Sequence, residues 1–150
     1  MLLKKALVLA ASVGGPETVK AFLDHLPSGL EFVLLYVQHN DAKDNSRMVQ
    51  ALIHNSEYDC RVAEYGEVLS EDTVTLVSGQ QLDILADGTM GARLMARRAG
   101  QIWIQSPVSC VADSMPKAIN RTGRVTATGT PEKLAGFYAM KNQARSAAFA

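Results

Sequence analysis

Short apolar runs alternate with segments of helical periodicity along most of the chain. The runs lie at residues 7–11, 32–37, 102–104 and 125–127, and several have the continuous apolar character of strands covered on both faces of a sheet. Between them, apolar residues recur along one helical face at residues 16–26, 90–99 and 131–145. This alternation predicts an α/β fold with a doubly wound, mainly parallel sheet, helices on both faces and right-handed crossovers.

The middle of the chain is less regular. Residues 61–79 alternate apolar and polar side chains around Gly66 and Asp72, which predicts short strands or a hairpin at a sheet edge. A further strand is expected at residues 82–85. The 150 residues contain no internal repeat, low-complexity tract or Pro/Ser-rich linker, and their number is that of one ordinary domain. We therefore expect a single domain over residues 1–150.

Composition narrows the classes of partner. The 15 basic and 15 acidic side chains give a formal net charge of zero, which argues against nucleic acid or an anionic membrane as the main partner. No apolar run approaches the roughly 20 residues that span a bilayer, so we expect no direct membrane insertion. The start, "MLLKKALVLAAS", resembles a secretory signal, but its short apolar part fits a buried first strand better. Cys60 and Cys110 lie far apart, which favours free thiols in a reducing compartment and a cytoplasmic protein.

Polar residues follow three predicted strands. Ser12 follows the first strand, His39 follows "FVLLYVQ", and Asp87 follows "LDILA". The carboxyl ends of parallel strands lie along one edge of a sheet, where ligands and catalytic groups collect. We therefore expect these three side chains to meet at that edge.

Serine, histidine and aspartate are the set that nucleophilic acyl chemistry requires. An imidazole accepts the proton of the serine hydroxyl, and a carboxylate orients the imidazole and stabilises its charged form. Backbone N–H groups after the serine, together with a helix beginning near Pro16, would face a developing oxyanion. Each residue alone has a simpler interpretation: Ser12 as a helix cap or turn residue, His39 as a structural histidine, and Asp87 as part of an Asp-Gly turn.

The phrases that hold these residues resemble the catalytic domain of the CheB-type protein-glutamate methylesterases. "AASVGGPE" at residues 10–17 is similar to the family's Gly-Ala-Ser-Thr-Gly-Gly-Pro-Glu phrase, whose serine is the nucleophile. "LP" at residues 26–27 and "VQH" at residues 37–39 match the phrases that precede and contain the catalytic histidine. "DGTMGARLM" at residues 87–95 resembles the phrase that carries the catalytic aspartate. "AGQIWIQSPVSCVADSMPKAI" at residues 99–119 continues the resemblance, which spans nearly the whole chain in the correct order.

The resemblance implies a doubly wound α/β domain that hydrolyses glutamyl methyl esters, and often deamidates glutamines, on chemotaxis receptors. It places the nucleophile at Ser12, the proton-transfer base at His39 and the orienting carboxylate at Asp87. Backbone donors at Val13 or Gly14, with Ile84, would hold the oxyanion. No cofactor or metal is implied, and the partner would be a methyl-accepting chemotaxis receptor or a pilus-associated sensory protein.

This sequence also departs from the family. Val13 stands where the family has threonine, and residues 84–86 replace a Gly-Met-Gly segment, which changes the backbone angles available at low cost. A longer family segment with a Pro-Ser-Val-Asp phrase has no counterpart between "VTLVSG" and "LDILADG", and no receiver domain is present in the sequence. These departures leave two interpretations: a minimal, unregulated esterase, or a degenerate relative retained as a binding module.

Three other kinds of site receive less support from the residues. A phosphate-binding turn at residues 12–16 would use the N–H groups of a helix start, but the chain has neither Gly-x-Gly-x-x-Gly nor a Walker lysine. The three histidines, His25, His39 and His54, lack zinc spacing. A nucleophilic Cys110 would need a neighbouring base that the sequence does not identify.

Overall fold

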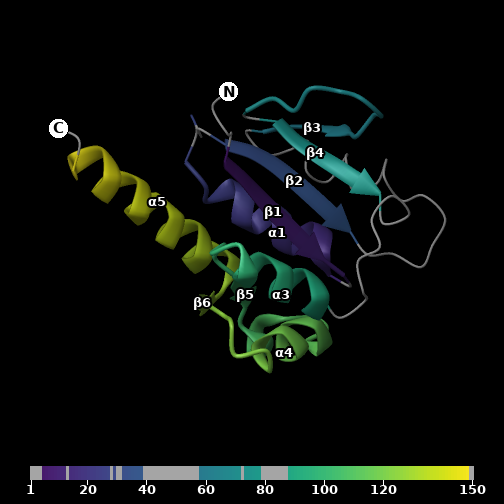
Figure 1. The fold of residues 1–150 in the computed structure, drawn as a ribbon, viewed down its shortest axis with the longest axis vertical. Helices are drawn as coiled ribbons and strands as arrows, with labels where there is room; N and C mark the ends of the chain where they lie inside the picture. Colours follow the sequence, from purple (N-terminus) through teal and green to yellow (C-terminus); the bar gives the residue numbers. More distant parts are fainter. Residues whose placement is uncertain are drawn as a thin grey trace.

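The computed structural model describes residues 5–12, 14–27, 29, 32–38, 58–71, 73–78 and 88–148. The helices in these ranges are α1 (Gly15–Asp24), α3 (Thr89–Arg97), α4 (Ser114–Asn120) and α5 (Pro131–Ala148), with a short 3₁₀ helix, η1 (Pro107–Ser109). The strands are β1 (Lys5–Ala11), β2 (Phe32–Gln38), β3 (Asp59–Val62), β4 (Thr73–Ser78), β5 (Trp103–Gln105) and β6 (Ala127–Gly129). Figure 1 shows β1, β2, β4 and β3 side by side, α3 and α4 together with β5 and β6 below β1, and α5 extending away from the sheet.

The strands pair in parallel, as the alternation of strands and helices predicted. One sheet has the order β1-β2-β4-β3, and β5 pairs with β6 in a second. Strands β5 and β6 begin one and two residues later than the apolar pattern predicted. The Thr126 N–H donates to the Ile102 carbonyl, and the Thr126 hydroxyl accepts from the Ile102 N–H. The Thr126 side chain thus joins the two segments just before the ladder of β5 and β6 begins.

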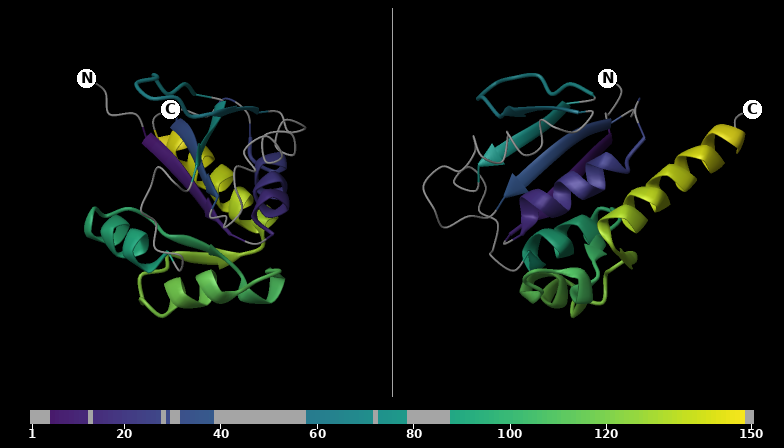
Figure 2. Two further views of the ribbon diagram at one scale, coloured as in Figure 1. Left: turned by 90° about the vertical axis from the view of Figure 1, so that its right-hand side faces the viewer. Right: turned by 180° about the vertical axis from the view of Figure 1, so that it is seen from behind.

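The main core lies on one face of the four-stranded sheet. Val19, Phe22 and Leu23 from α1, and Leu134 and Ala135 from α5, pack against the buried side chains of the strands, Leu34, Tyr36, Val74 and Leu76. Viewed from behind in Figure 2, α1 lies over β1 and β2. Burying an aliphatic side chain of this size contributes about 1.5–3 kcal/mol, so this layer is the main source of stability for the sheet.

A second cluster covers the opposite face of β5. Trp103 and Ala127 pack against the main core, which contains α5, whereas Ile102 and Ile104 pack against Ala92 of α3. Ile119 of α4 packs against the same cluster. Figure 2 shows α3 and α4 beside β5 and β6, away from β3 and β4. Helices therefore lie on both faces of this pair of strands, as the doubly wound prediction required.

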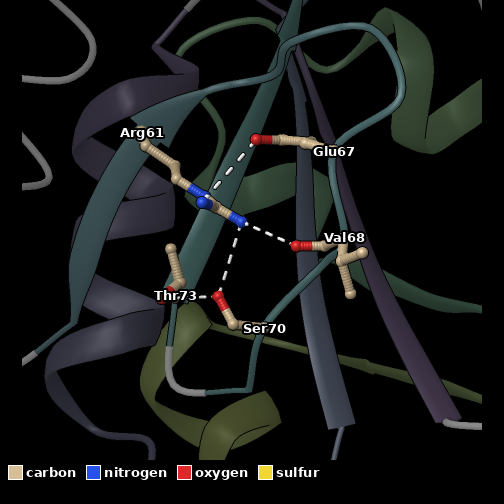
Figure 3. Close-up of polar contacts among 5 residues, drawn as sticks. All are labelled: Arg61, Glu67, Val68, Ser70 and Thr73. Atoms are coloured by element: carbon tan, nitrogen blue, oxygen red, sulfur yellow. Dashed lines mark hydrogen bonds and ion pairs between the residues drawn. The ribbon is translucent and has the colours of Figure 1, made fainter.

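The irregular middle segment forms strands β3 and β4, which confirms the prediction of short strands at a sheet edge, but the hairpin alternative is wrong. The two strands are parallel, with Cys60 beside Val74, and β3 is one of the two edge strands of the described sheet. The connection between them must therefore carry the chain back to its starting end. The Arg61 guanidinium helps to hold that connection, since it donates to the Val68 carbonyl at 3.1 Å and to the Ser70 hydroxyl at 3.4 Å (Figure 3).

An ion pair adds to these hydrogen bonds, and together they form a clamp on the loop between β3 and β4. Arg61 lies 3.6 Å from Glu67, and the Ser70 hydroxyl reaches Thr73, the first residue of β4, at 3.4 Å. The alternating pattern within residues 61–79 therefore includes a return loop as well as strands. The strand expected at residues 82–85 lies outside the described residues.

Replacing Arg61 tests this clamp. Arg61→Met should lower the free energy of unfolding by about 1 kcal/mol, because the two hydrogen bonds that the partly exposed guanidinium donates and its ion pair with Glu67 are lost. Arg124→Met, at an exposed arginine, should change it by less than about 0.5 kcal/mol. Urea unfolding of both variants measures the difference, and equal stabilities would show that the loop does not depend on Arg61.

Candidate active site

Ser12 lies where β1 turns into α1. Its backbone carbonyl accepts a hydrogen bond from the Gly15 N–H at 2.8 Å, which closes a four-residue turn. Gly14, with φ 74° and ψ 6°, has a left-handed backbone conformation, which glycine adopts at low cost. Gly14 is also the N-cap of α1, without a side-chain cap hydrogen bond. Ser12 is therefore a turn residue and not the helix cap, and Pro16 lies in the first helical turn, as expected.

A second donor reaches the same carbonyl from the neighbouring strand. The Gln38 side-chain amide donates from Nε2 to the Ser12 carbonyl at 2.8 Å, and Gln38 Oε1 accepts a hydrogen bond from the Tyr36 hydroxyl. Tyr36 is fully buried, and this burial raises the pKa of its hydroxyl, with smaller contributions from the charges of Glu17 and Cys60. The tyrosine therefore stays protonated and serves as a donor.

Gly15 makes room for this hydrogen-bonded chain. A Cβ atom at Gly15 would overlap Gln38 Oε1 and would lie 2.7 Å from the Cβ of Ala11. The helix can begin immediately beside the Gln38 amide only because residue 15 has no side chain. The Gly-Gly pair of the sequence thus has two physical roles: a left-handed angle at Gly14 and close approach at Gly15.

The segment between η1 and the end of α4 lies against this turn. The Cγ2 atom of Val111 is 2.9 Å from the position of a Cβ on Gly14, so Val111 packs directly on the glycine. Gly88, the residue after Asp87, is the N-cap of α3, and a Cβ there would lie 3.1 Å from Cδ1 of Ile119. The turn after Ser12 and the start of α3 therefore contact one continuous stretch of the chain.

The structure describes two of the predicted site residues, Ser12 and Gly14, at the carboxyl end of β1. His39 and Asp87 lie outside the described residues, as do Val13 and Ile84. The residues preceding Ser12 and His39 are nevertheless neighbours, because Ala11 and Gln38 are partners in the parallel register of β1 and β2.

Sequence reasoning missed Tyr36 and Gln38. The signal for Gln38 is its polar side chain at the end of an otherwise apolar strand, directly before the predicted catalytic histidine, His39. Tyr36 gave a weaker signal, since a tyrosine within an apolar strand packs like any other aromatic residue.

The cysteines have the properties of unreactive thiols. Burial raises the pKa of Cys60 to about 11, and burial followed by the charge of Asp113 raises the pKa of Cys110. Because the thiolate is the nucleophilic form, neither residue is activated at neutral pH. Within the described ranges, no group of three or more histidine, cysteine or acidic residues could hold a metal ion. No helix of this part of the chain is long and apolar enough to cross a membrane.

A serine at a strand-to-helix turn of a parallel α/β domain lies at the carboxyl edge of the sheet. This is the edge at which several hydrolase folds place their catalytic side chains. The chain belongs to the CheB methylesterase family, whose model matches residues 7–86 and 83–137. The two matched pieces overlap at residues 83–86.

Curated relatives agree with this assignment. A protein-glutamate methylesterase/protein-glutamine glutaminase of Saccharophagus degradans is 23% identical over 167 residues, covering 81% of this chain and 46% of the relative. One of Halobacterium salinarum is 40% identical over 60 residues, covering 40% of this chain and 17% of the relative. The chain thus spans less than half the length of these curated relatives.

A solved structure confirms the fold class. The CheB methylesterase catalytic domain of Thermotoga maritima superposes with a TM-score of 0.81 at 18% sequence identity, covering 90% of this chain and 97% of that domain. The doubly wound α/β architecture predicted from the alternation of strands and helices is therefore confirmed.

Substituting Gly15 tests the close approach at the turn. Gly15→Ala should lower the free energy of unfolding by about 1–3 kcal/mol, because the added methyl group overlaps Gln38 and Ala11. Gly136→Ala is the matched control, since a Cβ at this α5 position meets nothing within 4 Å, and it should stabilise the helix by about 0.5–1 kcal/mol. Urea denaturation of both variants compares them, and a neutral Gly15→Ala would contradict the packing described.

Proposed function

We propose that this chain is a serine hydrolase domain that removes methyl groups from glutamyl methyl esters, and deamidates glutamines, on chemotaxis receptors or related sensory proteins. The observation that carries the proposal is Ser12, which lies at a glycine-rich turn between β1 and α1 in a chain of the CheB methylesterase family. The names of the relatives, which include both methylesterase and glutaminase activity, support the two reactions.

The proposed catalytic groups are Ser12, His39 and Asp87. The pairing of Ala11 with Gln38 supports placing His39 near Ser12, since each catalytic residue directly follows one member of the pair. The contacts of Gly14 and Gly88 with the stretch from Val111 to Ile119 support placing Asp87 on the same side. In this arrangement His39 accepts the serine proton, and Asp87 orients the imidazole.

The oxyanion would be held by backbone N–H groups. We assign this role to Val13 or Gly14, together with Ile84. Helix α1 begins at Gly15, so the positive end of its dipole lies beside the turn and favours negative charge there.

The reaction then proceeds in two steps, acylation of Ser12 and hydrolysis of the acyl-serine. The Ser12 oxygen bonds to the ester carbon, the serine proton passes through His39 to the leaving oxygen, and methanol departs to leave an acyl-serine. Water, deprotonated by His39, attacks that acyl group and releases glutamate, while the proton returns to Ser12. With a glutamine substrate, ammonia replaces methanol. Side chains and water supply every proton in these two steps, so the reaction requires no cofactor.

The partner would be a helical receptor, either a methyl-accepting chemotaxis receptor or a pilus-associated sensory protein. Its methylated side chains must be accessible to the carboxyl edge of β1. We propose a cytoplasmic location, which agrees with the buried free thiol of Cys60.

The second candidate is a non-catalytic module that binds the same kind of receptor. The observation that favours it is the split match to the family model, whose two pieces cover residues 7–86 and 83–137 and so divide just before Asp87. A chain altered in this region could retain the receptor surface and lose turnover.

Methanol release from a methylated receptor distinguishes the two candidates. The purified protein should release methanol, and Ser12→Ala should lower kcat by about 10⁴-fold or more, because the nucleophile is lost. Cys110→Ala should keep kcat within about twofold, since the Cys110 thiol is protonated and takes no part. Receptor binding without methanol release, unchanged by Ser12→Ala, would contradict the hydrolase and favour the binding module.

A further inference from the structure

We propose that Gln38 is a positioning residue for Ser12, and that the Tyr36 hydroxyl holds the Gln38 amide in place. This inference rests on the proposed function, because it assigns Gln38 a role in the reaction of Ser12. It concerns the chain of hydrogen bonds that runs from the buried Tyr36 hydroxyl through Gln38 to the Ser12 carbonyl.

The two hydrogen bonds to the Ser12 carbonyl differ in kind. The Gly15 N–H belongs to the same turn, so this bond closes the turn but moves with it. The Gln38 amide belongs to β2, so its bond fixes the turn relative to the neighbouring strand. Because His39 directly follows Gln38, the residue that holds the nucleophile's backbone is also covalently attached to the proposed base.

Holding this carbonyl also acts on the oxyanion site. The carbonyl of Ser12 and the N–H that follows it belong to one planar peptide unit and point in opposite directions. That N–H is one of the donors we assign to the oxyanion. Gln38 therefore orients both the residue that attacks and a donor that stabilises the product of the attack, although it touches neither the substrate nor the reacting atoms.

Tyr36 restrains the Gln38 amide from the side of the core. A carbonyl oxygen can only accept a hydrogen bond, so the Ser12 carbonyl itself turns Nε2 toward Ser12 and Oε1 away from it. Oε1 then faces the buried Tyr36 hydroxyl, which donates to it. With phenylalanine at residue 36, Oε1 would lose this donor, and the amide would be held less firmly against Ser12.

Steady-state kinetics of methanol release tests the proposal. Gln38→Met keeps the length of the side chain but removes its hydrogen bonds, and it should lower kcat about 10-fold with KM within about twofold. Tyr36→Phe should lower kcat by about 3-fold to 10-fold for the same reason. The double variant should be no slower than Gln38→Met, since both changes act through one amide.

Tyr58→Phe is the matched control. Tyr58 is a buried tyrosine of the same core, and its hydroxyl donates to the Pro27 carbonyl at 2.6 Å. Its removal should cost similar stability but leave kcat within about twofold. A kcat for Gln38→Met equal to that of the unmodified protein, or an equal fall in Tyr58→Phe and Tyr36→Phe, would overturn the positioning role.

Hydrogen exchange separates this proposal from the proposed function. If the unmodified protein releases no methanol, the hydrolase fails, but Gln38 can still be judged by the protection of the Gly15 amide. In Gln38→Met, that amide should exchange about 10-fold faster, because the turn is no longer tied to β2. The Ser106 amide, which donates to the Gly129 carbonyl at 2.8 Å, should keep its exchange rate. Unchanged protection of Gly15 would overturn the proposal even in an inactive protein.

Discussion

The backbone carbonyl of Ser12 is the point on which the candidate site depends. It accepts one hydrogen bond from the turn that leads into α1 and another from a side chain of β2. The second of these bonds joins the turn after β1, where the proposed nucleophile lies, to β2, the strand that precedes the proposed base. Burial of Tyr36 beneath α1 extends the connection into the main core, so the packing that stabilises the domain also fixes the turn.

The conformation of the turn follows from two glycines with different requirements. Gly14 supplies a left-handed backbone angle and lies against Val111, whereas Gly15 leaves space for the Gln38 amide. Neither requirement could be met by a residue with a side chain without strain or displacement. The same turn starts α1, which places the positive end of the helix dipole beside Ser12.

Much of the fold could be predicted because its signals are local. The apolar run of β2 and the helical periodicity of α1 identify those elements without reference to the rest of the chain. The parallel pairing of β3 and β4 could not be predicted in this way, since it depends on a return loop held by Arg61, and alternation alone also fits a hairpin. Strands β5 and β6 begin later than the apolar pattern predicts, because the Ile102 N–H donates to the Thr126 side chain instead of making a backbone ladder bond.

The residues of the candidate site also differ in whether the sequence alone could predict them. Ser12 and its glycines carry a sequence signature, and the structure places them at the carboxyl end of β1. Tyr36 and Gln38 have no such signature, because their role arises from the register between two strands that are distant in sequence. The meeting of Ser12, His39 and Asp87 remains a prediction, as two of these residues lie outside the described ranges.

In the proposed reaction, Ser12 becomes covalently acylated by a glutamyl side chain. Mass spectrometry of protein quenched in acid during turnover with a methylated receptor peptide detects this acyl group. We expect a mass gain equal to the substrate peptide minus methanol on the fragment that contains Ser12. Methanol release with the acyl group on the Cys110 fragment, or without an adduct in a protein whose Ser12→Ala variant is fully active, would contradict it.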